Sequence, residues 1–221
     1  MSKPRDQSGG VHHVVCRGNN KRPVFESPGD RAWFLHLFNE TARAADWSVH
    51  GYALMTNHYH LILGIEDGAL GDPMCELNTG YATWFNRKNG RINHLFGRRY
   101  WNELLADEHR YFAALRYVIR NPTRAGIPGP LTSHTWTSYP ASLGLDDPPI
   151  RLARDDLFRM FDPRPTQAVF EYRQLCESFE GPAYSRAAVR GRPPRQRTEM
   201  VAASITRRAQ MSDGSVTPAL R

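Results

Sequence analysis

The chain has 221 residues, three cysteines and a formal net charge of +7. No apolar run approaches the roughly 18 residues that a membrane-spanning helix needs, and residues 1–10 are polar, so we expect neither a membrane span nor a signal peptide. The cysteines (Cys16, Cys75 and Cys176) are isolated and odd in number. They exclude a disulfide framework and suit a reducing cytoplasm.

The positive charge is concentrated at the C-terminal end. After Ser185, eight arginines stand against two acidic residues, which leaves the preceding chain close to neutral. The net charge therefore indicates a basic tail and not a uniformly basic domain. Nucleic-acid binding by the main domain has to be argued from local clusters of basic residues.

The first half of the chain predicts three strands and a helix. A β-rich run at 11–17 ends at a Gly-Asn-Asn turn, and Asp30 is a candidate cap for a helix over 31–45 with aromatic residues at helical spacing. Strands at 47–55 and 58–64 follow. The turn that joins these two strands is too short for a crossover, so they are expected to pair as an antiparallel hairpin.

The second half predicts a helix over 73–87, a strand within 100–105, and a helix over 108–120 that is capped by Asp107 and stopped by Asn121-Pro122. Shorter helical regions follow near 155–161 and 166–179. The order β-α-β-β-α-β-α is typical of an α/β (α+β) ferredoxin-like sandwich. We expect an antiparallel sheet with helices on one face, followed by an irregular and helical C-terminal extension.

Composition divides the chain into four parts. Residues 1–10 form a flexible N-terminus, residues 11–140 form the main domain, and residues 141–180 form the loop and helical extension. The basic tail at 181–221 consists mostly of Arg, Pro, Ser and Ala with few large apolar residues, which predicts disorder.

Two histidines lie two residues apart in the strand at 58–64. Successive strand side chains point to opposite faces, so His58 and His60 share a face while Tyr59, Leu61 and Leu63 point the other way. Two imidazoles this close can bind one divalent metal ion. The alternative is a pair of half-buried histidines with no ligand, because a two-residue motif is a weak signal by itself.

The helix over 108–120 carries a tyrosine on an unexpected side. At about 100° per residue, Tyr117 lies roughly 140° from Phe112 and away from the stripe that Phe112 and Leu115 begin. Asn121 lies on the side of Tyr117 one turn later. A tyrosine used only for packing would lie with Phe112, so Tyr117 is a candidate functional residue; the alternative is a partly exposed surface tyrosine.

Taken together, these motifs resemble the single-tyrosine HUH transposases, and are closest to the REP-associated tyrosine transposases. The resemblance covers residues 11–140. It is carried, in family order, by Leu54-Met55-Thr56-Asn57-His58-Tyr59-His60-Leu61, Asn78-x-x-Tyr81-Ala82-x-x-Phe85-Asn86-Arg87, His94-Leu95-Phe96-x-x-Arg99-Tyr100, Arg116-Tyr117-Val118-Ile119-Arg120-Asn121-Pro122-Thr123-Arg124-Ala125-Gly126 and Trp136-Thr137-Ser138-Tyr139.

The resemblance implies a role for each site residue. His58, His60 and Asn121 correspond to the ligands of a divalent metal, Mg²⁺ or Mn²⁺, and Tyr117 corresponds to the nucleophile. Glutamine is the third ligand in other single-tyrosine members, so Asn121 departs from that pattern. Thr56 is a second departure, since proline is common before the Asn-His pair. Family members commonly work as dimers, which makes a homodimer the expected assembly.

The implied reaction is transesterification on single-stranded or hairpin DNA. The tyrosine attacks a backbone phosphorus, forms a 5′-phosphotyrosine and leaves a 3′-hydroxyl that can later reverse the step. The covalent intermediate conserves the phosphodiester energy, so no ATP is required. The sequence agrees, since it has no Gly-rich phosphate loop followed by Lys-Ser or Lys-Thr.

Basic residues supply candidate DNA contacts in two places. One group lies between Glu76 and Glu103, a stretch without acidic residues but with interleaved aromatics, and the other surrounds the tyrosine. The two groups are Arg87, Lys88, Arg91, Arg98 and Arg99, and Arg116, Arg120 and Arg124. This mixture suits backbone neutralisation and base stacking on a single strand. The alternative for the first group is a solvated loop beside core aromatics.

The expected function is therefore metal-dependent nicking and joining of single-stranded or hairpin DNA by a cytoplasmic, nucleoid-associated bacterial enzyme. Two other functions stay open at this point. A non-catalytic module of the same fold would bind structured nucleic acid without cutting it. A hydrolytic metalloenzyme would use His58 and His60 with water as the nucleophile and would not need Tyr117.

Overall fold

The computed structural model describes residues 8–178. The basic tail predicted at 181–221 and most of the N-terminal segment predicted at 1–10 lie outside the described residues.

Within the described residues, four strands form one antiparallel sheet. They are β1 (Gly10–Arg17), β2 (Ser48–Met55), β3 (His58–Ile65) and β4 (Trp101–Leu104), in the spatial order β2-β3-β1-β4. The two-residue turn pairs β2 with β3 as an antiparallel hairpin, as predicted, and β3 also pairs with β1. This order is that of the predicted ferredoxin-like sandwich.

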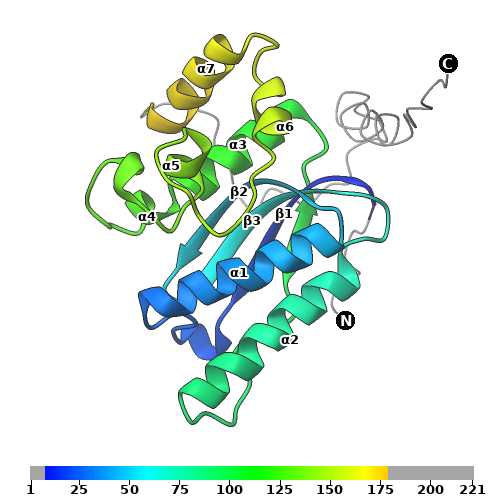
Figure 1. The fold of residues 1–221 in the computed structure, drawn as a ribbon, viewed down its shortest axis with the longest axis vertical. Coiled ribbons are helices and arrows are strands. Elements are labelled where there is room, and N and C mark those ends of the chain that lie inside the picture. The colour runs from blue at the N-terminus through cyan, green and yellow to red at the C-terminus, as the bar shows by residue number, and fades with distance from the viewer. Residues whose placement is uncertain (1–7, 179–221) are drawn as a thin grey trace, which may run out of the picture.

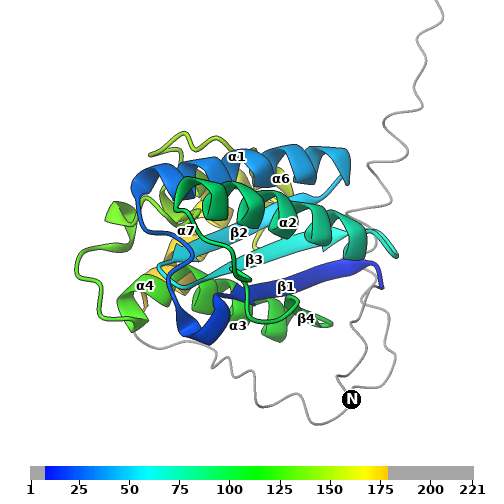
Figure 2. The same cartoon turned by 90° about the horizontal axis from the view of Figure 1, so that it is seen from below.

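Helices cover both faces of the sheet (Figures 1 and 2). The helices α1 (Pro28–Ala44) and α2 (Gly71–Lys88) lie side by side on one face, as expected. The opposite face is covered by α3 (Glu108–Ile119), which the prediction of helices on one face did not include. The short helix α4 (Asn121–Arg124) follows α3 almost directly. The two are separate helices because Pro122 has no backbone N–H to continue the hydrogen bonding of α3.

The start of α1 differs from the prediction. Ser27, not Asp30, is the N-cap: its side chain accepts from the Asp30 backbone N–H, while the Asp30 carboxylate accepts from the Ser27 N–H. This reciprocal capping box, with Pro28 in the first turn, begins the helix three residues earlier than predicted. Asp30 also pairs with Lys88, which joins the start of α1 to the end of α2.

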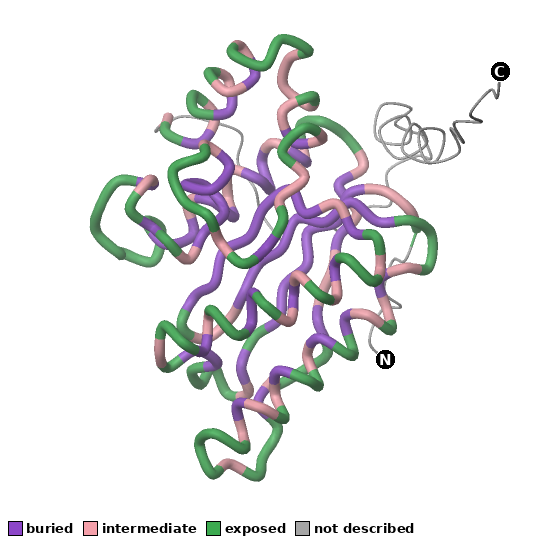
Figure 3. Tube along the Cα trace, viewed as in Figure 1, coloured by how far each residue is buried: buried purple, intermediate pink, exposed green. Residues whose placement is uncertain are grey.

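Two hydrophobic cores lie on either side of the sheet. The first, beneath α1 and α2, is rich in aromatic rings such as Phe34, Tyr59 and Tyr81. The second, beneath α3, includes Ile62 and Leu115. Figure 3 shows that the strands between the two helical layers are buried along most of their length.

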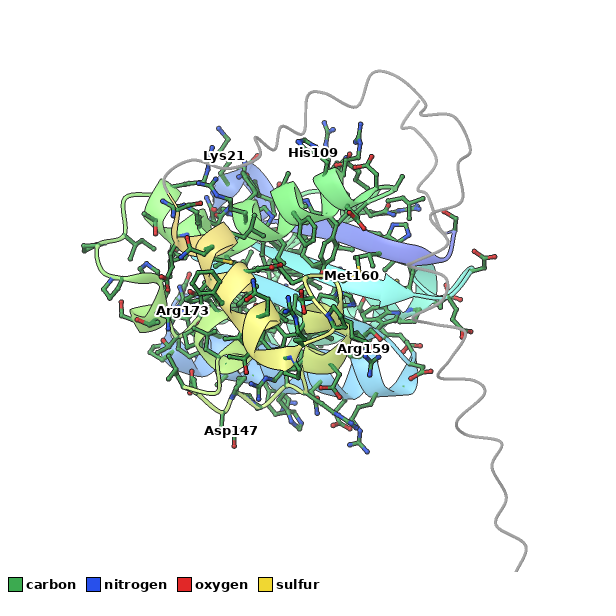
Figure 4. The ribbon with its side chains drawn as sticks, turned by 90° about the horizontal axis from the view of Figure 1, so that it is seen from above. Lys21, His109, Asp147, Arg159, Met160 and Arg173 are labelled. Carbon is green, nitrogen blue, oxygen red and sulfur yellow. The ribbon has the colours of Figure 1, made fainter. Side chains whose placement is uncertain are left out.

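The segment that follows α4 covers one edge of the sheet. The Leu54 N–H donates to the Trp136 carbonyl and the Ser138 N–H donates to the Tyr52 carbonyl, so the chain around 136–138 covers β2. The remaining helices are α5 (Tyr139–Ser142), α6 (Arg154–Arg159) and α7 (Pro165–Glu177), and two 3₁₀ helices span Asn19–Lys21 and Leu131–Ser133. Figure 4 looks onto α6 and α7, drawn in yellow at the front, with Arg159 and Arg173 labelled. No helix within residues 8–178 combines the length and the apolar character that crossing a bilayer requires.

Candidate active site

The first half of β3 presents both predicted histidines to the α3 side of the sheet. His60 is buried, with 1 % of its surface exposed, and His58 is half-buried at the start of the strand. Their ring centroids are 4.9 Å apart and their planes are nearly perpendicular, at 80°. Tyr59 points to the opposite face, where its ring lies 4.7 Å from that of Phe34. The alternation predicted from the sequence is therefore present.

The α3–α4 junction brings Tyr117 and Asn121 to these histidines within a single chain. The Tyr117 ring lies 5.5 Å from the His60 ring, edge to face at 82°. The Asn121 side chain is buried, and its Nδ2 is 3.2 Å from His60 Nε2. His58 on β3, Tyr117 on α3 and Asn121 on α4 therefore all lie next to His60, although the helical residues are some 60 positions away in the sequence.

The donor set at this point consists of two imidazoles and one carboxamide. Within residues 8–178, no group of three or more His, Cys, Asp or Glu side chains is arranged to hold a metal ion. His58, His60 and Asn121 are the residues that would hold a divalent cation here. Asn121 faces His60 with its amide nitrogen, so its oxygen would become a ligand once the carboxamide turns over. Such a set leaves coordination positions for phosphate oxygens and water, as open catalytic sites do, whereas structural zinc sites are closed by four ligands.

A third histidine, which the sequence interpretation missed, completes the cluster. His13 on β1 is fully buried, and its Nε2 is 2.9 Å from His60 Nδ1. The two rings are stacked with centroids 5.1 Å apart, and the Tyr117 ring lies 6.1 Å from His13. Period-2 alternation along β1 separates His13 from His12, but only the pairing of β1 with β3 shows which of the two meets His60.

The basic residues near Tyr117 have different surroundings. The Arg124 guanidinium is exposed and lies 5.3 Å from the centre of the Tyr117 ring. Arg116 donates to the carbonyls of Leu175 (3.1 Å) and Ser178 (2.7 Å), and Arg120 donates to the Cys176 carbonyl at 2.9 Å. These carbonyls lie at the C-terminal end of α7, where a positive charge is favourable. Arg116 and Arg120 therefore attach α7 to α3, and their contact with DNA stays a prediction.

The predicted basic cluster near α2 is likewise divided. Lys88 pairs with Asp30, and Arg91 pairs with Glu26 at 3.5 Å. The side chains of Arg87, Arg98 and Arg99 are exposed.

A groove of about 990 Å³ lies between α2 and the segment 92–100, and Arg98, Arg99 and His94 are among its lining residues. Tyr100 belongs to the core beneath α1 and α2. The next residue, Trp101, lies with its ring 5.6 Å from that of His13 on the other face. The β4 edge thus separates the groove from the histidine cluster.

Comparison with known protein families decides the class of this molecule. Residues 7–118 match the family described as IS200-like transposases, and the match spans half of the chain. The chain belongs to the IS200-like transposase family. The match includes His58, His60 and Tyr117 and ends just before Asn121.

One solved structure similar to this transposase is that of a REP-associated tyrosine transposase bound to a REP hairpin. It aligns with a TM-score of 0.52 and 16% sequence identity, over 66% of this chain and 89% of that one. At this identity the likeness concerns the fold, which the two proteins share. No curated protein matches the chain. Family membership makes this chain an enzyme of DNA transposition, which favours the catalytic interpretation over a binding module without activity.

Proposed function

We propose that this transposase nicks and rejoins single-stranded DNA through Tyr117, assisted by a divalent cation held by His58, His60 and Asn121. One observation carries the proposal: the Tyr117 ring lies 5.5 Å from the His60 ring in the same chain. A nucleophile and the group that binds its target phosphate must be close together, because orientation supplies a large part of the catalysis.

The chemical step is a transesterification. The Tyr117 oxygen forms a bond to phosphorus, and the bond between phosphorus and the 3′ oxygen breaks. The phenol loses one proton and the leaving 3′ oxygen gains one, which leaves a 3′-hydroxyl and a 5′-phosphotyrosine. Attack by a 3′-hydroxyl on the phosphotyrosine reverses these changes and joins two strands without an external energy source.

Positive charge near the reacting groups favours this step. The Arg124 guanidinium lies 5.3 Å from the ring centre of Tyr117. In this proposal it would stabilise negative charge on the attacking oxygen and on the phosphate. His58, His60 and Asn121 are the residues that would hold Mg²⁺ or Mn²⁺. When bound, such a cation polarises the scissile phosphate as a Lewis acid.

The proposed substrate is hairpin DNA with a single-stranded flank. Two observations support it: the fold of this chain is shared with a transposase that was solved with a REP hairpin, and three arginines are exposed near α2. Arg87, Arg98 and Arg99 would neutralise backbone phosphates beside the groove. The homodimer expected from the family resemblance stays part of this proposal.

The deciding experiment compares two tyrosines of α3. A DNA hairpin with a single-stranded flank, labelled at its 3′ end, is incubated with protein and Mn²⁺, and covalent adducts are separated on a denaturing gel. Tyr117→Phe removes only a hydroxyl and should abolish the adduct while DNA affinity stays within about twofold. The matched control is Tyr111→Phe on the same helix, which should keep the adduct, since the Tyr111 hydroxyl contacts His50 and not the site.

Three outcomes would contradict the proposal. An adduct that persists in Tyr117→Phe would identify another nucleophile. Cleavage that persists in Tyr117→Phe without any adduct would support the hydrolytic alternative, in which water attacks. Cleavage by the wild-type protein that is unaffected by a chelator would exclude the divalent cation.

A second experiment tests the DNA-binding face. The double variant Arg98→Gln with Arg99→Gln should flatten the dependence of log affinity on log salt by about 1.4, because each phosphate contact on a single strand contributes about 0.7. The control, Arg159→Gln with Arg173→Gln, removes the same charge from α6 and α7, away from the groove. An equal change of slope in both variants would mean that net charge alone governs binding.

A further inference from the structure

We infer that Asn57 and His13 are positioning residues which hold His58 and His60 in the tautomer whose Nε2 atom is the ligand nitrogen. The inference rests on the proposed role of the two histidines as cation ligands. A neutral imidazole carries one proton, and the nitrogen without the proton is the one that can bind a metal ion. Whatever holds the proton on Nδ1 therefore prepares Nε2.

The orientation of Asn57 is determined by its own neighbours. Its side-chain Nδ2 donates to the Lys21 carbonyl at 3.0 Å, which turns the carboxamide oxygen towards the histidine. That oxygen lies 2.7 Å from His58 Nδ1. A carboxamide oxygen only accepts hydrogen bonds, so His58 carries its proton on Nδ1 and donates it to Asn57. Nε2 of His58 is then the unprotonated nitrogen.

The backbone around Asn57 is held by the loop after β1. The Gly18 N–H donates to the Asn57 carbonyl at 2.9 Å. A Cβ atom at Gly18 would lie 2.2 Å from the Arg22 carbonyl oxygen, so only glycine allows the chain to approach in this way. The His58 tautomer is thus set by a turn and a loop that come from different parts of the sequence.

His13 acts on His60 in the same manner from the neighbouring strand. His60 Nδ1 is 2.9 Å from His13 Nε2, while His60 Nε2 faces the Asn121 amide at 3.2 Å. The amide nitrogen of Asn121 only donates, so His60 Nε2 is the acceptor, and His60 carries its proton on Nδ1 and donates it to His13. Both Nδ1–H donors, from His58 and from His60, then point away from the proposed cation.

Neither Asn57 nor His13 belongs to the proposed ligand set, so each acts through a ligand. Residues that orient ligating histidines in this way typically change metal affinity by about 10- to 100-fold when they are removed. We expect losses in that range for Asn57→Ala and for His13→Phe, each measured as the affinity for Mn²⁺ alone by electron paramagnetic resonance.

Matched controls lie next to each positioning residue. His12→Phe changes the neighbouring histidine of β1, which contacts the Ser8 carbonyl at 2.8 Å and Asn102. Thr56→Ala changes the exposed residue before Asn57. Both controls should bind Mn²⁺ within about twofold of the wild type. His13→Gln, whose carboxamide oxygen can accept from His60 Nδ1, should recover most of the affinity that His13→Phe loses.

A spectroscopic measurement makes the inference testable without any variant. In the metal-free wild-type protein, nitrogen-15 shifts should show both His58 and His60 protonated on Nδ1. A dominant Nε2–H signal for His60 would overturn the inference, as would equal Mn²⁺ affinity in His13→Phe and His12→Phe. Either result would overturn the positioning roles of Asn57 and His13 but would not contradict Tyr117 as the nucleophile. The proposed function itself would fail if the adduct formed without Tyr117.

Discussion

The two faces of the central sheet are buried to a similar degree and yet are built from different side chains. On the face beneath α1 and α2, β3 contributes Tyr59, Leu61 and Leu63 to an aromatic and aliphatic core. On the face beneath α3, the same strand contributes His58 and His60, and His60 meets polar groups from β1 and α4. One strand therefore contributes to the hydrophobic core with one set of alternating side chains and to the candidate active site with the other.

This difference shows how a buried polar cluster is retained. Burying a polar group costs free energy unless it is hydrogen-bonded, so His60 is tolerated at 1 % exposure because both of its ring nitrogens face polar partners. The opposite face needs no such network. There, the Tyr59 hydroxyl donates to Asn78 Oδ1 and the Tyr81 hydroxyl donates to the Val24 carbonyl, each at 2.6 Å.

The largest expected effect comes from the polar face. His60→Ala should lower metal-dependent cleavage by about 10³-fold, because loss of a ligand that polarises the phosphate removes several kcal/mol of transition-state stabilisation. Adduct formation measured under single-turnover conditions tests this. A His60→Ala protein that cleaves within tenfold of the wild type would place the chemistry elsewhere.

On the apolar face, a substitution should lower the stability of the fold and leave cleavage unchanged. The Phe34 ring is fully buried and contacts the rings of Phe25, Tyr59 and Tyr81. Phe34→Ala should lower the free energy of unfolding by about 3–5 kcal/mol, which urea denaturation measures. Adduct formation per folded molecule should be unchanged at low temperature, and a specific loss of activity would show that the two faces are coupled.

A histidine at the other end of the α3 face offers a test by pH. Burial lowers the pKa of His50 to about 4, against a smaller opposing effect of Asp156. Between pH 6.5 and pH 4, His50 is therefore protonated in the unfolded chain but neutral in the folded chain. The free energy of unfolding falls as the pH falls through this window, and this group does not affect it above the window.

His50→Gln removes this titration. At pH 5 the wild type should have lost about 2 kcal/mol relative to pH 7 through this group, at about 1.4 kcal/mol per pKa unit. The difference between pH 7 and pH 5 in the free energy of unfolding should be smaller in the variant by that amount. An identical pH dependence in both proteins would show that His50 takes up a proton in the folded state.

The smallest effect is expected at the start of α1. Ser27→Ala removes the side-chain acceptor for the Asp30 N–H and should cost about 1 kcal/mol of stability, with no change in cleavage. The matched substitution Ser133→Ala lies in a short 3₁₀ helix after α4, where the hydroxyl donates to the Pro130 carbonyl. We expect a smaller loss there, and an equal loss would argue against the capping box.

Local rules predicted the elements well because each depends on a few neighbouring residues. The two-residue turn between β2 and β3, the Asp107 cap of α3 and the interruption at Pro122 all follow from short-range sterics and hydrogen bonding. The error at the start of α1 has the same origin. Asp30 and Ser27 are both good N-caps, and the capping box uses both, so only the observed bonds show which is the cap.

The features of the candidate site can be separated in the same way, into those that local patterns predict and those that depend on distant contacts. The sequence by itself determined that His58 and His60 share a face and that Tyr117 lies off the apolar stripe of its helix, because the periods of strands and helices are properties of the local backbone. Tertiary structure alone decided that His13, and not His12, meets His60, and that Arg116 and Arg120 bind the end of α7. These contacts join residues that are far apart in the chain, and their identity depends on strand register and helix packing, which no local pattern contains.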